Sequence, residues 1–126
     1  MFLIEPVKRL ILALAFAMLA LPAAATELLM VERDDCVWCR RWFAEVGPAY
    51  QNSDEGKRAP LNRFNLANGQ PKMTLKKPVR FTPTFILIHE EREVGRIVGY
   101  LDNAMFWGLL GSMLKRLDES FARSVP

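Results

Sequence analysis

The chain of 126 residues contains two cysteines, Cys36 and Cys39, with two residues between them. Thiols at this spacing can form a disulfide when they occupy the first turn of a helix. A side chain that caps a helix faces unpaired backbone N–H groups and the positive end of the helix dipole, and both favour a thiolate. The pair therefore predicts dithiol–disulfide exchange, in which Cys36 is the nucleophile and Cys39 resolves the mixed disulfide.

Other uses of a C-x-x-C pair fit this sequence less well. A c-type haem attachment needs histidine directly after the second cysteine, and that residue is Arg40. A structural zinc site normally has four Cys or His ligands, whereas the chain has two cysteines and one histidine, His89. A purely structural disulfide stays open, although closing so short a loop restricts the unfolded chain little. We therefore expect neither a metal nor another cofactor.

Residues 1–25 are predicted to be a cleaved secretory signal peptide. Lys8 and Arg9 supply the positive start, and residues 10–21 form an apolar run shorter than the ~20 residues that span a bilayer. Three alanines at positions 23–25 offer a cleavage site, and an uncleaved anchor is the alternative. Export would place the cysteines in the periplasm, where disulfides persist.

Residues 26–126 then form one small domain. The chain has 17 Lys and Arg against 14 Asp and Glu, and the signal holds Lys8, Arg9 and Glu5, which leaves +2 for this domain. That charge is too small to indicate nucleic-acid binding. No second apolar stretch has spanning length, and nothing in the sequence points to an obligate dimer, so we expect a soluble monomer.

Hydrophobic patterning predicts an alternating order of strands and helices after the signal. A strand over residues 26–32 leads to a helix that begins at about Cys36 and is kinked or ended by Gly47 and Pro48. Residues 51–59 look like a loop, residues 61–66 like a second strand parallel to the first, and residues 69–80 like a connector that holds at most one helical turn. We expect a right-handed crossover between the parallel strands.

The second half of the chain predicts a central strand over residues 84–88, a hairpin partner over 93–100 and a last helix capped by Asp102 and ending at about Leu117. Within that helix, Gly108 and Gly111 suggest close packing on the sheet. The fold class is therefore α/β, a central mixed sheet with helices on both faces. The last helix should bury a stripe made of Phe106, Leu109, Leu110, Met113, Leu114 and Leu117.

A second group of residues makes the fold more specific. Phe81-Thr82-Pro83-Thr84 opens the central strand, and together with the C-x-x-C it resembles the thioredoxin superfamily. The resemblance implies a thioredoxin-like fold in which Pro83 is cis and lies against the disulfide. It also implies that Thr82 offers backbone groups to an extended substrate.

Other side chains should border the thiols. Trp38, inside the motif, is expected to be exposed and to contact a protein substrate. A basic rim formed by Lys72, Lys76, Lys77 and Arg80 is a further expectation, and it would steer acidic partners or anionic sulfur adducts.

Some positions depart from the thioredoxin pattern. Asp35 and Val37-Trp38 stand where thioredoxins have the residues of W-C-G-P-C. Met30 occupies the position of a buried aspartate that accepts a proton from the resolving thiol, so Glu32 is the remaining candidate for that role.

The segments around the two motifs resemble a narrower group, the small periplasmic thioredoxins of bacterial sulfur-oxidation (Sox) systems, of the SoxS type. This resemblance implies a reductase that keeps the cysteine of a periplasmic sulfur-carrier protein free of adducts. It also implies that a membrane thiol transporter supplies the electrons. Two alternatives remain: a disulfide oxidase or isomerase for exported proteins, and a non-catalytic binding module with an inert disulfide.

Overall fold

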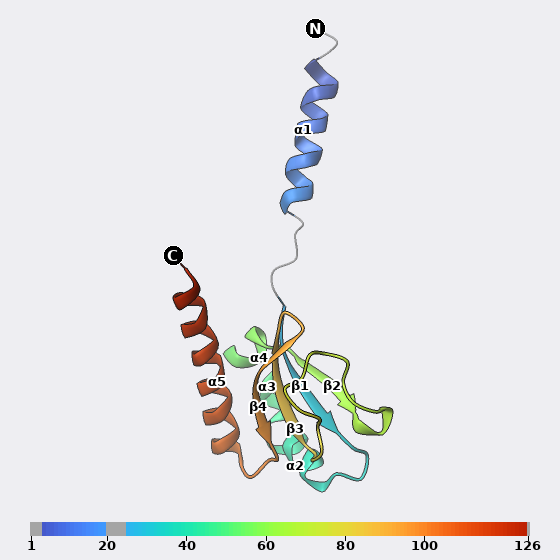
Figure 1. Ribbon diagram of the computed structural model, residues 1–126, viewed down its shortest axis with the longest axis vertical. Helices are drawn as coiled ribbons and strands as arrows, with labels where there is room; N and C mark the ends of the chain where they lie inside the picture. The colour runs from blue at the N-terminus through green and yellow to red at the C-terminus, as the bar shows by residue number, and fades with distance from the viewer. Residues whose placement is uncertain (1–3, 20–24, 126) are drawn as a thin grey trace.

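The computed structural model describes residues 4–19 and 25–125 (Figure 1). The first helix, α1 (Ile4–Leu19), covers most of the predicted signal, and its side chains at Val7, Leu10 and Ile11 are exposed. The first two alanines of the predicted cleavage site lie outside the described residues. None of the helices within residues 4–19 and 25–125 is both long enough and apolar enough to span a membrane.

Four strands form one mixed sheet in the order β2-β1-β3-β4. β1 (Thr26–Glu32) is parallel to β2 (Leu61–Asn65) and antiparallel to β3 (Thr84–His89), which in turn pairs with β4 (Arg92–Val98) as a hairpin. The predicted parallel pair, central strand and hairpin are all confirmed. β3 is an interior strand, and its residues 84–88 are buried, as its continuous apolar sequence predicts.

The α-helices after α1 pack against one face of the sheet, whereas helices were expected on both faces. The first helix after the cysteine loop, α2 (Val37–Glu45), is followed directly by α3 (Gly47–Tyr50), so the chain breaks at the predicted Gly47-Pro48. Trp42 is fully buried beneath both and has its ring centroid 5.2 Å from that of Phe85 and 5.5 Å from that of Phe106. These aromatic rings join the helices to β3 and α5 (Asn103–Ser124).

Two predictions about helices were wrong in their extent. Residues 51–59 were expected to form a loop, but they contain a short helix, α4 (Asp54–Arg58), because Ser53 caps it through a hydrogen bond from Gly56 N to Ser53 Oγ of 2.9 Å. Asp102 caps α5 as predicted, yet that helix runs to Ser124 rather than ending at about Leu117. The buried stripe of α5 is confirmed except for Leu109, which is 42% exposed.

The other face of the sheet is covered mainly by irregular chain. Alternate residues of β1 and β3, including Leu29 and Ile86, point to this face and pack with Val79. The covering segment begins at a short 3₁₀ helix, η1 (Leu66–Asn68), and continues as an extended connector to residue 83. This connector matters for the site because it leads into the Thr82-Pro83 loop.

Candidate functional site

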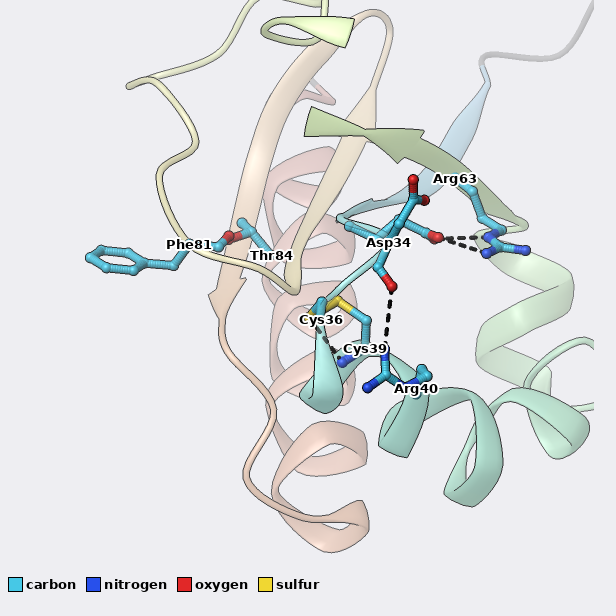
Figure 2. The surroundings of a disulfide bond; sticks show 8 residues. Asp34, Cys36, Cys39, Arg40, Arg63, Phe81 and Thr84 are labelled. Carbon is cyan, nitrogen blue, oxygen red and sulfur yellow. Dashed lines mark hydrogen bonds and ion pairs between the residues drawn. A yellow bond between two sulfur atoms is a disulfide. The ribbon is translucent and has the colours of Figure 1, made fainter. Parts of the chain in front are cut away.

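Cys36 and Cys39 form a disulfide at the start of α2 (Figure 2), with 5.2 Å between their Cα atoms. Cys36 is the N-cap residue in extended conformation, and its Sγ accepts a 3.1 Å hydrogen bond from the backbone N–H of Cys39. The two residues are 7% and 3% exposed, respectively. The predicted placement of Cys36 at a helix N-terminus is confirmed, so a thiolate there would face donors rather than acceptors.

Neither position considered for the proton acceptor of Cys39 provides a free carboxylate. Met30, at the position where an aspartate was considered, is fully buried in the same apolar cluster as both cysteines. The Glu32 carboxylate receives two hydrogen bonds from the guanidinium of Arg63, of 2.8 Å and 2.6 Å. Glu32 is therefore engaged in an ion pair, and its candidacy as proton acceptor for Cys39 finds no support.

The loop before β3 contains the Thr82–Pro83 peptide bond, which is cis, the isomer that the resemblance implied. Pro83 is buried, and its carbonyl accepts a 2.7 Å hydrogen bond from Gly99 N. The hydroxyl of Thr84 donates a 2.6 Å hydrogen bond to the carbonyl of Phe81. Phe85, the next residue, belongs to the buried cluster of the two cysteines, and Figure 2 shows this loop beside the disulfide.

Trp38 is 50% exposed, as expected, and lies on the wall of an apolar groove of about 270 Å³. The opposite wall comes from the end of β4 and from the first turns of α5. Several apolar side chains of this wall are exposed to solvent, namely Val98, Leu101, Met105 and Leu109. This surface explains why Leu109 departs from the buried stripe, and it offers apolar contact area next to the cysteines.

A network of polar side chains contacts the ring of Trp38 and holds it in position. The Arg41 guanidinium lies 5.5 Å from the centre of the Trp38 ring and 5.8 Å from that of Tyr100. The same guanidinium donates a 2.7 Å hydrogen bond to Glu45, which also accepts one from the Tyr100 hydroxyl. The bond from Tyr100, followed by that from Arg41, lowers the pKa of Glu45. Burial, followed by the hydrogen bond to this carboxylate, raises the pKa of Tyr100 to about 12.

Sequence reasoning named the cysteines, Trp38, Thr82 and Pro83, but missed Tyr100 and Glu45. The signal for the latter pair was weak, because 55 residues separate them. Of the predicted basic rim, Lys77 and Arg80 line a pocket beside the Thr82-Pro83 loop, whereas Lys72 and Lys76 are not among its lining residues. Across the described ranges, no group of three or more His, Cys, Asp and Glu side chains is placed to hold a metal ion.

The mixed sheet, the disulfide at the N-terminus of α2 and the cis-proline loop together define a thioredoxin-like protein. Such a C-x-x-C in this fold indicates thiol–disulfide exchange chemistry. The comparison with solved structures makes the family specific. The reduced form of the periplasmic thioredoxin SoxS from Paracoccus pantotrophus aligns with a TM-score of 0.70 and 39% identity, over 73% of this chain and 98% of that one. The chain therefore belongs to the family of SoxS-type periplasmic thioredoxins.

A thioredoxin of Malassezia sympodialis also aligns, with a TM-score of 0.49 and 13% identity over 70% of this chain and 74% of that one. No family model matches the sequence, and the search of curated proteins found no match either.

Proposed function

We propose that the protein is a periplasmic thiol:disulfide reductase whose client is a sulfur-carrier protein of a sulfur-oxidation system. The observation that carries the proposal is the position of Cys36, whose sulfur lies at the N-terminus of α2 and accepts a hydrogen bond from Cys39 N. The family relationship to the periplasmic SoxS supports the location. The type of client is proposed from the resemblance of the sequence to thioredoxins of sulfur-oxidation systems. Residues 1–25, as a cleaved signal peptide, would deliver the domain to that compartment.

The reaction begins with the dithiol form. The Cys36 thiolate attacks one sulfur of the client's disulfide or persulfide-type adduct, and the departing sulfur leaves as a thiolate that takes a proton from solvent. Cys39 then loses its proton and attacks Cys36 Sγ, which breaks the mixed disulfide and releases the client thiol. Two electrons have passed to the client, and Cys36 and Cys39 are left as the disulfide seen here.

Two further parts of the site have roles in this proposal. Thr82, ahead of the cis-proline, offers backbone groups along which an extended client segment aligns, and Trp38 contacts apolar side chains of the client. Re-reduction of the Cys36–Cys39 disulfide requires an external dithiol, for which a membrane thiol transporter is the proposed donor.

The experiment is to trap the client with Cys39→Ala. Without the resolving thiol, Cys36 should stay linked to its natural client, and mass spectrometry of periplasmic proteins then identifies the adduct. The Cys36→Ser/Cys39→Ala protein is the matched control and should capture nothing. One dominant adduct with a sulfur-carrier protein supports the proposal. A broad set of exported proteins would favour an oxidase or isomerase, and the absence of any adduct would favour a binding module.

The reduction potential separates the first two outcomes independently. A dedicated reductase should have a potential near or below about −230 mV, whereas an oxidase or isomerase lies above about −200 mV. Equilibration of the isolated domain with glutathione, followed by thiol alkylation, measures it directly.

A further inference from the structure

A second pocket lies on the other side of the Thr82-Pro83 loop, between the connector and β4. It has a volume of about 310 Å³ and shares Val98 with the apolar groove of Trp38, so the two hollows adjoin across this residue. Phe81 and Thr84, which flank the loop, both line it. A client segment that runs along Thr82 therefore passes the mouth of this pocket. Its walls are formed by Lys77, Pro78, Arg80, Phe81, Thr84, Arg96 and Val98.

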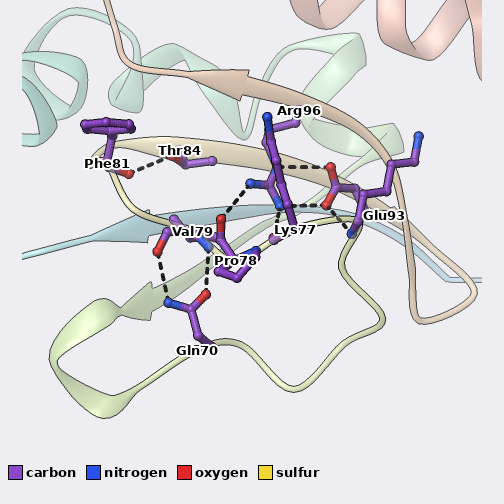
Figure 3. A network of polar contacts seen from close by, with 9 residues as sticks. Gln70, Lys77, Pro78, Val79, Phe81, Thr84, Glu93 and Arg96 are labelled. Atoms are coloured by element: carbon purple, nitrogen blue, oxygen red, sulfur yellow. Dashed lines mark hydrogen bonds and ion pairs between the residues drawn. The ribbon is translucent and has the colours of Figure 1, made fainter.

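The walls of this pocket are held by a network of polar contacts (Figure 3). Arg96 donates hydrogen bonds to the carbonyls of Lys77 and Pro78, of 2.7 Å and 3.3 Å, and so fixes the connector to β4. Its guanidinium also forms an ion pair of 2.7 Å with Glu93, and the two side chains are 9% and 3% exposed. The site is thus fixed before any ligand arrives, which reduces the entropy lost on binding.

The connector is fastened at a second point. The Gln70 side chain donates a 2.9 Å hydrogen bond to the carbonyl of Val79 and accepts one of 2.7 Å from its N–H. This pairing and the Thr84–Phe81 hydrogen bond hold the residues on both sides of Arg80. Arg80 therefore extends from a segment whose backbone is fixed on both sides.

The pocket has a positive charge that its own residues do not cancel. Three cationic side chains line it and no acidic one does. Glu93 neutralises Arg96, but Lys77 and Arg80 are exposed and form no ion pair within the part of the chain that the structure describes. Two positive charges thus border a partly enclosed hollow that is also lined by the exposed side chain of Phe81. Such a surface attracts a carboxylate.

We infer that this pocket binds an acidic side chain of the protein client, close in sequence to the cysteine that Cys36 attacks. The inference rests on the proposed function and adds a rule for selecting clients. A segment extended along Thr82 carries its neighbouring side chains past Phe81 or Thr84, at about 3.3 Å per residue. An aspartate or glutamate a few residues from the cysteine then meets Lys77 and Arg80, while residues on the other side meet the apolar groove.

The test uses short peptides of defined charge. Each has a central cysteine joined by a disulfide to 2-mercaptoethanol, with two aspartates either before or after the cysteine, or with lysines or alanines at the same places. The rate at which each peptide oxidises the reduced domain is measured and divided by the rate with bis(2-hydroxyethyl) disulfide. For one of the two placements of the charged residues, before or after the cysteine, we expect the aspartate peptide to react about five- to twentyfold faster than its lysine counterpart at low salt. The preference should fall as ionic strength rises.

The variants locate the preference on the molecule. Lys77→Glu/Arg80→Glu should invert it, so that the lysine peptide becomes the faster one. Lys115→Glu/Arg116→Glu makes the same change in net charge on the exposed side of α5 and should leave the preference as in the wild type. Because all proteins are compared on the same peptides, effects of aspartate on the peptide's own thiol cancel.

Each result has a definite meaning. If the preference survives Lys77→Glu/Arg80→Glu, or if both charge variants change it equally, the pocket does not select acidic clients and the inference is wrong. An equal rate for aspartate and lysine peptides in the wild type would also overturn it. Failure of the reduced wild type to reduce any of these disulfides would instead contradict the proposed function.

Discussion

The hydroxyl of Tyr100 donates a 2.5 Å hydrogen bond to the carboxylate of Glu45, which joins the segment after β4 to the end of α2. Arg41 completes the arrangement by pairing with Glu45 and lying against the ring of Trp38. Trp38 is the residue between the two cysteines that is best placed to contact a client. Its ring is thus held in position by the charged side chains of Arg41 and Glu45, which follow it in α2.

This network predicts a pH-dependent contribution to stability. The hydrogen bond from Tyr100 lowers the pKa of Glu45, so its contribution is present above the unfolded value of 4.5 and is lost as pH falls. The pKa of Tyr100 is raised from 10.0 to about 12, so its contribution is present below pH 10 and is lost as pH rises toward 12. The difference in urea midpoint between wild type and Tyr100→Phe should therefore be greatest between about pH 5 and 10.

Urea titrations followed by circular dichroism across this pH range would measure that difference. Glu45→Gln is the companion variant, because it should remove the part of the pH dependence of the urea midpoint that comes from protonation of Glu45 at low pH. A difference between wild type and Tyr100→Phe that is constant with pH would mean that the hydroxyl contributes only packing.

The position of Cys36 predicts unequal reactivity of the two thiols. In the reduced protein, the N-terminus of α2 stabilises the Cys36 thiolate, whereas Cys39 is 3% exposed and lies one turn inside the helix. Iodoacetamide should therefore modify Cys36 at least about tenfold faster than Cys39 at pH 7. Peptide mapping after a timed reaction gives both rates.

The urea-unfolded protein provides the control for this measurement. There the two cysteines should react at similar rates, and half-maximal reactivity should need a higher pH than for Cys36 in the folded domain. Equal rates in the folded protein would show that the helix terminus does not activate Cys36.

The parts of the fold that were predicted correctly have strong local signals. The continuous apolar run at residues 84–88 is compatible with few structures. The same holds for the helix cap at Asp102 and the apolar stripe that follows it. The helix at residues 54–58 was missed because its sequence is polar on every side, and only Ser53 marks its start. Tertiary contacts also fix its position, since Gly56 is buried against Tyr50 and Arg58 forms an ion pair with Asp118, and a local pattern does not contain them.

The site divides in the same way. Cys36 and Cys39 could be named because their spacing alone limits their chemistry, and Thr82-Pro83 because, together with the C-x-x-C, it resembles the thioredoxin superfamily. Arg96 and Glu93 gave no such signal, since they belong to a strand whose charged residues suggest a solvated surface. They are buried because the connector folds over β4. Its path is fixed by the Gln70 side chain and by an isolated bridge between Thr74 and Arg92 rather than by regular secondary structure.

Two glycines predict opposite effects of the same substitution. A Cβ at Gly56 would lie 1.8 Å from the carbonyl oxygen of Tyr50, so Gly56→Ala should destabilise the domain by about 1–3 kcal/mol or more. At Gly108 nothing lies within 4 Å, so Gly108→Ala should gain up to about 1 kcal/mol of helix stability. Gly111 is equally free of neighbours, so the expected close packing of these two glycines on the sheet was wrong. Urea unfolding distinguishes the two signs, and a loss of stability in Gly108→Ala would contradict the open environment of that residue.

The ion pair of Arg96 and Glu93 predicts strongly non-additive substitutions. Arg96→Met leaves a carboxylate that is 3% exposed without its partner, so the free energy of unfolding should fall by about 3–5 kcal/mol. In Arg96→Met/Glu93→Gln no charge remains buried, and the glutamine can still accept the hydrogen bond from Lys76 N. The double variant should therefore be more stable than Arg96→Met alone, although the connector loses its bonds to Arg96 in both.

The more exposed pair of Arg63 and Glu32 is the control for this cycle. Arg63 is 60% exposed, so Arg63→Met should cost no more than about 1 kcal/mol, and adding Glu32→Gln should change little. If the Arg96 and Glu93 substitutions are as nearly additive as the control pair, the buried charges are not coupled. Strong coupling in the Arg96–Glu93 pair alone would instead show that these two charges depend on each other for their burial at the wall of the pocket beside the cis-proline.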